Sequence, residues 1–489
     1  MFFFKMTYHE REQGKEAEGL AAGLEWINGW LQPVLWGWPV LCLILLAGVL
    51  FTFRLGFFQV THCGLWLKKT MGSLFCRKKA DEDRCNISPF QALTTALAGS
   101  IGTGNIVGVA TALTLGGPGA IFWMWVSAGL GMMTIFAETV LGLKYRQKDK
   151  QGRWLGGAMY YLQYGLGSKG LAVVFAGACV LASFGMGNMA QSNSIGSSLQ
   201  NTFGIPPLLT GGMVAVVLAL VLMGGIQRIA KVTEKIVPAM SICYLLAGLI
   251  LLGVFWRNIP EAFAQIFASA FDLRGVLGGV GGYGMLTAMR TGISRGIFTN
   301  EAGLGSSVMA HSSAETKEPV EQGMWGIFQV FIDTIVVCTI TALCILCTNV
   351  MGSGLDGAAL SAAAFQSVFG RFGQGLIAVS ITFFAFATML GWSYYGECAL
   401  RYLCGLSRFL SRHSKGTVTL YRLVFAAVTL LGCQLELWLV WDVCDTLNGC
   451  MAIPNLIAVF FLSGEVVRET RSYLKRKRMG ELGSSPKQT

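Results

Sequence analysis

The chain has 489 residues, of which 53% are hydrophobic and only 13% are charged. A soluble globular chain carries roughly 25% charged residues, so this composition excludes a soluble enzyme and a disordered protein. The 63 glycines and the net charge of +11 fit closely packed membrane helices whose cytoplasmic connections hold an excess of Lys and Arg. The sequence therefore predicts an all-α polytopic membrane protein, embedded in a lipid bilayer and not bound to nucleic acid.

A helix needs about 20 apolar residues to cross the hydrocarbon core of a bilayer. The sequence has eleven candidate segments, at 34–53, 89–115, 119–143, 171–199, 207–224, 236–255, 275–293, 323–348, 373–395, 417–433 and 438–463. The connections alternate between rich and poor in Lys and Arg, and 31 of the 37 fall on one side. Because cytoplasmic connections are enriched in Lys and Arg, we expect the N-terminus outside and the C-terminus in the cytoplasm.

Glycine clusters interrupt two of these segments. The second segment contains GSIGTGN at 99–105, and the seventh contains GGVGGYG at 278–284. An interruption frees backbone N–H and C=O groups that lipid cannot satisfy, so it must line a cavity in the protein or bind something. The two clusters lie five segments apart, and this odd offset gives them opposite orientations, as an inverted 5+5 repeat requires. Paired interruptions of this kind predict the central binding site of a secondary transporter.

The residue types at the first interruption suggest its ligands. Backbone N–H groups near Gly102, Thr103 and Gly104 would lie at the N-terminus of a half-helix, where a carboxylate binds favourably. Carbonyl groups at the preceding half-helix end, together with hydroxyl or amide oxygens, can coordinate Na⁺. Neither cluster contains a cationic side chain. The sequence therefore favours a small zwitterion held by backbone dipoles.

The sequence shows no convincing enzyme motif. The four histidines are scattered at His9, His62, His311 and His413, which argues against a metal centre. The glycines at 102–108 miss the dinucleotide fingerprint by one residue and follow no predicted strand. We expect no enzymatic activity and no bound cofactor.

Several long motifs resemble one family. The stretch PFQALTTALAGSIGTGNIVGVATALTLGGP at 89–118 is similar to the signature of the sodium:alanine symporter family, also called the alanine or glycine:cation symporters. Further similar motifs are SFGMGNMAQSNS at 183–194, RGIFTNEAGLG at 295–305, AHSSAETKEPVEQG at 310–323, LGWSYYGE at 390–397 and DTLNGCMAIPNL at 445–456. The resemblance implies a LeuT-type fold, in which segments 2–11 form two inverted repeats of five helices after one extra N-terminal helix.

This resemblance also implies a division of the chain and a function. The parts are an extracytoplasmic segment 1–33, the extra helix 34–53, a cytoplasmic loop 54–88, the first repeat 89–255, the second repeat 256–463 and a basic cytoplasmic tail 464–489. The implied function is Na⁺-coupled import of small neutral amino acids across the bacterial inner membrane by alternating access. Alanine and glycine are the chief expected substrates, with D-alanine and serine as further candidates, and Na⁺ is the coupling ion.

The resemblance implies the site residues as well. The expected substrate-binding residues are Gly102, Thr103, Gly104, Asn105, Gln191, Val280, Gly281, Gly284 and Trp392. The expected Na⁺ ligands are Ser100, Gly102 and Thr388. Many relatives have an aromatic or larger residue at Val280, so the size of the pocket, and with it alanine against a larger substrate, stays open.

Each of the polar candidates also has a purely structural interpretation. Asn105 could cap the second half-helix, and Gln191 could bridge two helices without touching substrate. Trp392 could be a packing residue or an interface anchor. Thr388 could hydrogen-bond a carbonyl of its own helix.

Two acids, Glu138 and Asp333, are notable because they lie near the middle of predicted segments. Glu138 and Asp333 would each cost about 3 kcal/mol at the bilayer centre, so each should face the bundle interior with a partner or a bound proton. We favour a structural hydrogen-bonding role for Asp333. The polar stretch 294–322 is expected to be a solvated cytoplasmic connection that helps to close the inner gate.

Two other functions remain open. The first is a proton-coupled or exchanger-type amino acid permease on the same fold, with Asp333 or Glu138 as the proton carrier. The second is a channel or sensor, because glycine-broken helices occur in channels too.

Overall fold

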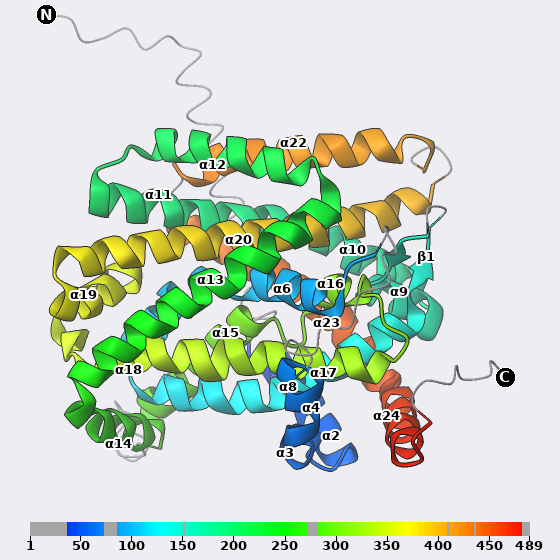
Figure 1. Ribbon diagram of the computed structural model, residues 1–489, viewed down its shortest axis with the longest axis horizontal. Helices are drawn as coiled ribbons and strands as arrows, with labels where there is room; N and C mark the ends of the chain where they lie inside the picture. Colours follow the sequence, from blue (N-terminus) through cyan, green and yellow to red (C-terminus); the bar gives the residue numbers. More distant parts are fainter. Residues whose placement is uncertain are drawn as a thin grey trace, which may run out of the picture.

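The computed structural model describes residues 37–72, 86–149, 152–271, 282–407, 411–434 and 437–481, and most of them are helical (Figure 1). The helices of the first half are α2 (Trp38–Arg54), α3 (Phe58–Thr61), α4 (Cys63–Lys69), α6 (Pro89–Ser100), η1 (Thr103–Asn105), α7 (Val107–Gly116), α8 (Gly119–Tyr145), α9 (Ala158–Tyr160), η2 (Tyr161–Gly165), α10 (Lys169–Phe184), η3 (Gly185–Met189), α11 (Ala190–Phe203), α12 (Pro207–Leu222) and α13 (Gly225–Val254). A short antiparallel hairpin, β1 (Gln147–Lys148) and β2 (Trp154–Leu155), follows α8.

The second half is also helical. Its helices are η4 (Trp256–Asn258), α14 (Ile259–Ala270), α15 (Gly282–Asn300), α16 (Val308–Ser312), α17 (Pro319–Val330), η5 (Phe331–Cys338), α18 (Thr339–Cys347), η6 (Val350–Gly352), α19 (Gly357–Phe369), α20 (Arg371–Gly405), α22 (Ser414–Gly432), α23 (Leu437–Phe461) and α24 (Ser463–Arg478). Every one of the predicted segments overlaps a helix, or helices joined at a break.

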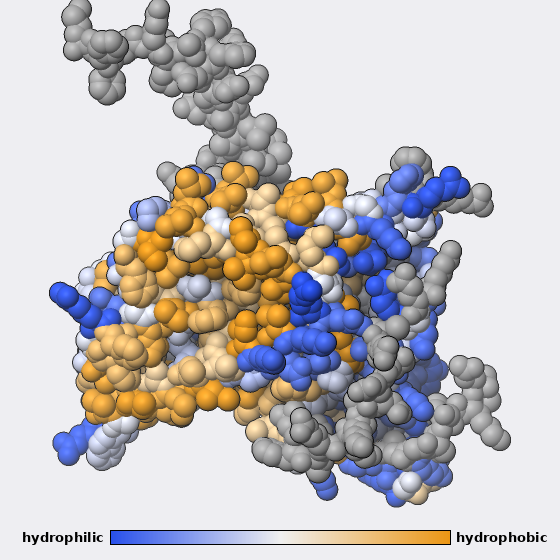
Figure 2. Space-filling model, turned by 45° about the horizontal axis from the view of Figure 1, so that its top comes forward, coloured by the Kyte–Doolittle hydropathy of each residue, from blue (hydrophilic) through white to orange (hydrophobic). Residues whose placement is uncertain are grey.

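Six helices of the described chain are long and apolar enough to cross a membrane, or up to seven if the bent pair Thr446–Phe461 and Ser463–Arg478 is one span. The predicted count of eleven spans therefore stays a prediction. Large apolar side chains lie exposed on α12, such as Leu208, Val216 and Leu220. Figure 2 shows a broad apolar face, and hydrophilic residues gather on the right, the side on which Figure 1 places α24 and β1. This distribution fits a protein surrounded by lipid.

Glycine allows the central helices to approach each other closely. α20 crosses α6 at Gly391, where an added Cβ would lie 2.6 Å from the backbone nitrogen of Gly99. No side chain fits between the two backbones there, which is the usual role of glycine in membrane helix packing. This contact holds the end of α6 against the middle of α20.

The extra N-terminal helix α2 packs against α8 of the first half and also against α15 and α23 of the second half. Ile44 of α2 is buried, and its side chain lies 3.1 Å from the position that a Cβ on Gly303 would occupy. At the other end of the helix, Nη1 of Arg54 donates to Oγ of Ser463 at 2.7 Å. α2 is therefore tied to the chain just beyond α15 and to the start of α24.

The second half contains a helix break at 301–307, between α15 and α16. The interruption predicted at 278–284 lies mostly outside the described residues, and its described part, Gly282 to Gly284, forms the first turn of α15. The expectation of a solvated connection at 294–322 is wrong for its central part. Asn300, Glu301 and His311 are all 0% exposed, because the chain here turns inside the protein rather than on its surface.

Candidate functional site at the first helix break

The sequence sets the two ends of α6. Ser88 and Gln91 form a capping box, in which each side chain accepts a hydrogen bond from the other's backbone N–H, and this arrangement stabilises a helix start. The helix ends at Ser100, and a single 3₁₀ turn, η1, precedes α7. The interruption lies where the glycine cluster predicts it, and all residues from 99 to 106 are buried.

Gly102 is in direct contact with α20. A Cβ on Gly102 would lie 2.3 Å from Oγ1 of Thr388 and 3.4 Å from Oε1 of Gln191. Only glycine leaves room for both side chains at this point. Oγ1 of Thr388 also donates to the carbonyl of Phe384 at 3.1 Å. Thr388 therefore bonds its own helix and touches the break, so the two interpretations of this residue are compatible.

Gln191, at the start of α11, bonds the break directly. Its Oε1 accepts from Oγ1 of Thr103 at 3.1 Å and from the backbone N–H of Thr103 at 3.4 Å. Its Nε2 donates to the carbonyl of Met186 in η3 at 3.1 Å, so the amide is held from both ends. Gln191 thus links η3 to the first break, and it does so through the hydroxyl and the backbone N–H of Thr103.

Asn105 connects the break to η5. Its Oδ1 accepts from the backbone N–H of Gly102 at 3.0 Å, which is the capping role. Its Nδ2 donates to Oδ1 of Asp333 at 2.8 Å and to the Asp333 carbonyl at 3.0 Å. Oγ1 of Thr334 donates to the other oxygen of Asp333 at 2.7 Å. The expected interior partner of Asp333 is confirmed, and it is Asn105 of the break.

Ser100, the last residue of α6, is also buried among polar groups. Its Oγ accepts from Nε2 of Gln329 at 3.4 Å, and Oε1 of Gln329 bonds Nε2 of His311 at 2.9 Å. The other ring nitrogen of His311 bonds Nε2 of Gln322 at 2.9 Å. A chain of side chains therefore runs from Ser100 to α16, just beyond the second break.

Trp392, on α20, is fully buried, with an exposed fraction of 0%. It packs against η3, where a Cβ on Gly187 would lie 2.3 Å from Cβ of Trp392. Its indole N–H lies beside the carboxyl group of Glu301, although the geometry between them falls short of a full hydrogen bond. Trp392 thus lies between η3 and the second break.

The second break contains a buried carboxyl network. Oε2 of Glu301 accepts from Oγ of Ser306 at 2.7 Å. Oε1 of Glu138 accepts from Nδ2 of Asn455 at 2.5 Å, and the same Nδ2 donates to the carbonyl of Gly303 at 2.9 Å. The expected partner of Glu138 is therefore confirmed. Sequence reasoning missed Glu301 and Asn455, although an acid beside the glycines of RGIFTNEAGLG was the available signal.

Some predicted site residues are not brought to the first break. Val280 and Gly281 lie outside the described residues. Gly284 is exposed in the first turn of α15, with nothing within 4 Å of an added Cβ. The part of α15 that touches the break is its other end, because a Cβ on Gly104 would lie 2.8 Å from Cγ2 of Thr299. Fifteen residues of helix span about 22 Å, so Gly284 is remote from this site.

Comparisons with known proteins agree with this architecture. The chain is 45% identical over 446 residues to the sodium/alanine symporter AgcS of Methanococcus maripaludis, covering 90% of this chain and 94% of that protein. It is 37% identical to the probable sodium/glutamine symporter GlnT of Bacillus subtilis, covering 94% and 92%. It is also 37% identical to the putative sodium/proton-dependent alanine carrier protein YrbD of Bacillus subtilis, covering 92% of each.

Solved structures show the same fold. The structure of MhsT in complex with L-phenylalanine matches 79% of this chain and 92% of that chain, with a TM-score of 0.58 and 13% identity. The similarity supports a LeuT-like helical transporter fold. The model of the sodium:alanine symporter family matches residues 21–487. The chain therefore belongs to the sodium:alanine symporter family.

Proposed function

We propose that this protein imports a small neutral amino acid across the bacterial inner membrane together with Na⁺, with its C-terminus in the cytoplasm. The observation that carries the proposal is the fully buried break at 101–106, where Gln191 and Thr388 from two other helices meet the backbone of Gly102 and Thr103. Irregular backbone at membrane depth is tolerated where it lines a binding cavity. The family of sodium:alanine symporters supplies the class of substrate and ion.

The amino acid carboxylate would bind at η1. In the structure, Oε1 of Gln191 accepts hydrogen bonds from both donors of Thr103. A substrate carboxylate oxygen is a stronger acceptor for the same two donors, and the start of a half-helix favours its negative charge. We therefore infer that the carboxylate takes the place of Oε1, while Gln191 stays anchored to Met186 and contacts the substrate from the side.

The Na⁺ ion would bind between the end of α6 and α20. Oγ1 of Thr388, the carbonyl groups near Gly102 and Oγ of Ser100 are oxygen atoms of the type that hard cations prefer. Thr388 and Gly102 are already in contact, so an ion there would fix α20 relative to the break. Because that contact shapes the amino acid site, Na⁺ and substrate would strengthen each other's binding by the same factor.

One Na⁺ per substrate is enough for useful accumulation. Moving one positive charge down about 100 mV releases about 2.3 kcal/mol, and a tenfold Na⁺ gradient adds about 1.4 kcal/mol. The total, about 3.7 kcal/mol, would sustain roughly a few-hundred-fold gradient of a neutral zwitterion.

Uptake of labelled alanine into proteoliposomes tests the proposal. An inward Na⁺ gradient should drive saturable uptake and counterflow, and choline in place of Na⁺ should abolish both. Gln191→Ala removes the acceptor that holds Thr103 and should abolish uptake without loss of expression. Full uptake by Gln191→Ala, or conductance without counterflow, would refute the carrier and its site. A competition panel of glycine, serine, D-alanine and glutamine would then define the substrate.

Proton coupling is the second candidate, and one observation favours it. Glu138, Glu301 and Asp333 are 0% exposed, and no salt bridge between described residues involves any of them. A buried carboxyl without a cationic partner is commonly protonated. Alanine uptake driven by a pH gradient in choline buffer, and lost in Glu138→Gln, would establish this alternative and exclude obligatory Na⁺ coupling.

A further inference from the structure

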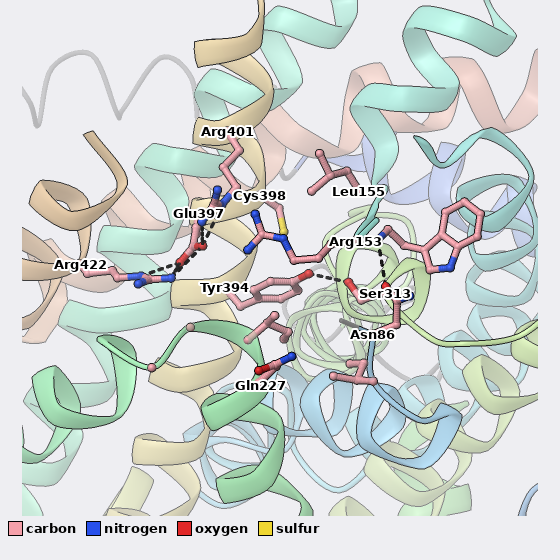
Figure 3. A pocket seen from close by; sticks show the side chains of 15 residues that line it. Asn86, Arg153, Leu155, Gln227, Ser313, Tyr394, Glu397, Cys398, Arg401 and Arg422 are labelled. Carbon is pink, nitrogen blue, oxygen red and sulfur yellow. Dashed lines mark hydrogen bonds and ion pairs between the residues drawn. The ribbon is translucent and has the colours of Figure 1, made fainter. Parts of the chain in front are cut away.

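A separate cavity lies on the predicted cytoplasmic side of the protein (Figure 3). Its volume is about 210 Å³. Residues from all five predicted cytoplasmic connections between spans line it, and examples are Asn86, Arg153, Gln227, Ser313 and Arg401. The sequence groups these connections only by their content of Lys and Arg. Their meeting around one cavity agrees with placing all five on the same side of the membrane.

The wall of this cavity is positively charged. Among the described residues it contains three arginines and a single acid, Glu397. Both oxygens of Glu397 are already occupied, because Nε of Arg401 donates to Oε1 at 2.9 Å and Nε of Arg422 donates to Oε2 at 2.8 Å. Glu397 therefore neutralises one of these two arginines and has no capacity for a further cation.

Arg153 is the third arginine. It extends from the hairpin β1–β2 toward Cys398 and Tyr394, which also line the cavity (Figure 3). Its counter-ion is Asp149, whose Oδ2 lies 2.8 Å from both Nε and Nη2 and which is not part of the cavity wall. The guanidinium has five N–H donors, and those that Asp149 does not engage can bind an anion inside the cavity.

Asn86 is a donor with no acceptor. Its Oδ1 accepts from the backbone N–H of Trp154 at 3.1 Å, which fixes the orientation of the amide. Its Nδ2 is buried and has no hydrogen-bond partner among the described residues. A buried donor that is left unsatisfied destabilises the folded protein unless a ligand or a water molecule accepts its hydrogen bond. The cavity wall therefore includes a guanidinium and an amide N–H₂ without an acceptor, and both groups are of the type that donates hydrogen bonds to a carboxylate.

A polar contact at the wall of this cavity joins α20 to the end of α16. The hydroxyl of Tyr394 bonds Oγ of Ser313 at 2.5 Å, and Tyr394 lies two residues beyond Trp392 on α20. Beside it, a parallel bridge joins Ile87 to Ala314, with the N–H of Glu315 donating to the carbonyl of Ile87 at 2.8 Å. Parting the hydroxyl pair and this bridge would open a route from the central site to the cavity.

We propose that this cavity is a release subsite, in which Arg153 and Nδ2 of Asn86 bind the carboxylate of the amino acid after it has passed Tyr394 and Ser313. The inference rests on the proposed function and adds a second substrate site to it. A volume of about 210 Å³ equals about seven water molecules at roughly 30 Å³ each. That space suits one small amino acid with a few waters. This subsite determines the affinity for the amino acid at the cytoplasmic face and does not affect its affinity at the outer face.

The sharpest test is Asn86→Asp. The new side chain keeps an oxygen for the N–H of Trp154 but replaces the free amide nitrogen by a carboxylate oxygen, which repels the ligand. Labelled alanine uptake is measured in right-side-out and inside-out membrane vesicles. We expect the half-saturating alanine concentration at the cytoplasmic face to rise at least tenfold, and that at the outer face to change less than twofold. Equal values for Asn86→Asp and the unaltered protein at the cytoplasmic face would overturn the proposal, as would an equal rise at both faces.

Arg153 provides an independent variant. Arg153→Gln should produce the same one-sided rise, and Arg153→Lys should restore part of the affinity because the positive charge returns. The matched control is Arg468→Gln, which removes an exposed tail arginine whose nearest acid is 3.9 Å away, and it should leave both faces unchanged. Alaninamide, a cation that lacks the carboxylate, should compete at the cytoplasmic face at least as well in Asn86→Asp as in the unaltered protein; weaker competition in the variant would contradict carboxylate binding.

Failure of this inference is distinguishable from failure of the proposed function. Absence of Na⁺-driven alanine uptake by the unaltered protein would remove the proposed function. Normal Na⁺-driven uptake, combined with unchanged cytoplasmic half-saturation in both Asn86→Asp and Arg153→Gln, would remove the release subsite alone.

Discussion

Gly102→Ala is the most direct test of the geometry of the first break. The added methyl group would lie 2.3 Å from Oγ1 of Thr388 and 3.3 Å from its Cβ. The backbone at Gly102 is extended, with φ −131°, so an alanine is permitted there and only space opposes it. Thr388 is β-branched and restricted in χ1, so it cannot simply rotate away, and α20 must shift. Overpacking of this kind costs about 1–3 kcal/mol.

If α20 shifts away from the break, the proposed Na⁺ site loses its hydroxyl ligand. We expect the half-saturating Na⁺ concentration for alanine uptake to rise roughly 5- to 150-fold, which is the equivalent of about 1–3 kcal/mol. The double variant Gly102→Ala/Thr388→Ala removes the closest atom and should recover thermal stability but not Na⁺ affinity.

The matched control is Gly108→Ala in α7, where an added Cβ meets nothing within 4 Å. It should be neutral, or more stable by up to about 1 kcal/mol from helix propensity. The measurements are thermal unfolding in detergent and the Na⁺ dependence of uptake. Gly102→Ala with the stability and Na⁺ affinity of Gly108→Ala would refute the close approach of Thr388 to the break.

Other parts of the structure give further predictions. Gly391→Ala places a methyl group 2.6 Å from the backbone nitrogen of Gly99; because backbone cannot rotate away, thermal stability should fall more than in Gly102→Ala. Asn105→Ala leaves the buried Asp333 carboxyl without its amide donor at 2.8 Å, and alanine uptake should disappear in proteoliposomes. Hydrogen bonds from Tyr145 and Lys144 outweigh the effect of burial and lower the pKa of Glu465 from its ordinary 4.5. This contribution to stability is therefore complete above about pH 4.5 and is lost as the pH falls through the lowered pKa. The difference in stability between the unaltered protein and Glu465→Gln should shrink as the pH falls below 4.5, and a constant difference would contradict it.

The first break could be predicted from sequence because its signal is local. Three glycines and a short run of polar residues within one apolar segment disrupt a helix wherever it packs. The contacts that complete the site could not be predicted without the family resemblance. The bond from Asn105 to Asp333 joins residues 228 positions apart, and no spacing rule connects two helices across such a distance.

The second break was missed for a related reason. Residues 300–311 are polar enough to be a solvated connection, and the glycine-rich stretch 278–284 gave a stronger local signal nearby. Burial of Glu301 and His311 depends on helices that pack over them from elsewhere in the chain. A polar stretch in a membrane protein can face water or line the protein interior. Its amino-acid composition is the same in both cases, so composition does not distinguish them.

The extra helix α2 gives the surrounding lipid a mechanical connection to the second break. One side of α2 carries exposed apolar residues, including Leu46 at 54% and Phe53 at 67% exposure, while Ile44 on another side rests on Gly303. A helix that tilts to match the hydrocarbon thickness would move Ile44 with it. We expect the acyl-chain length of the lipids to alter the rate of transport by this protein. Deletion of α2 should remove that dependence. The thickness of the membrane would then regulate the transporter much as a ligand does.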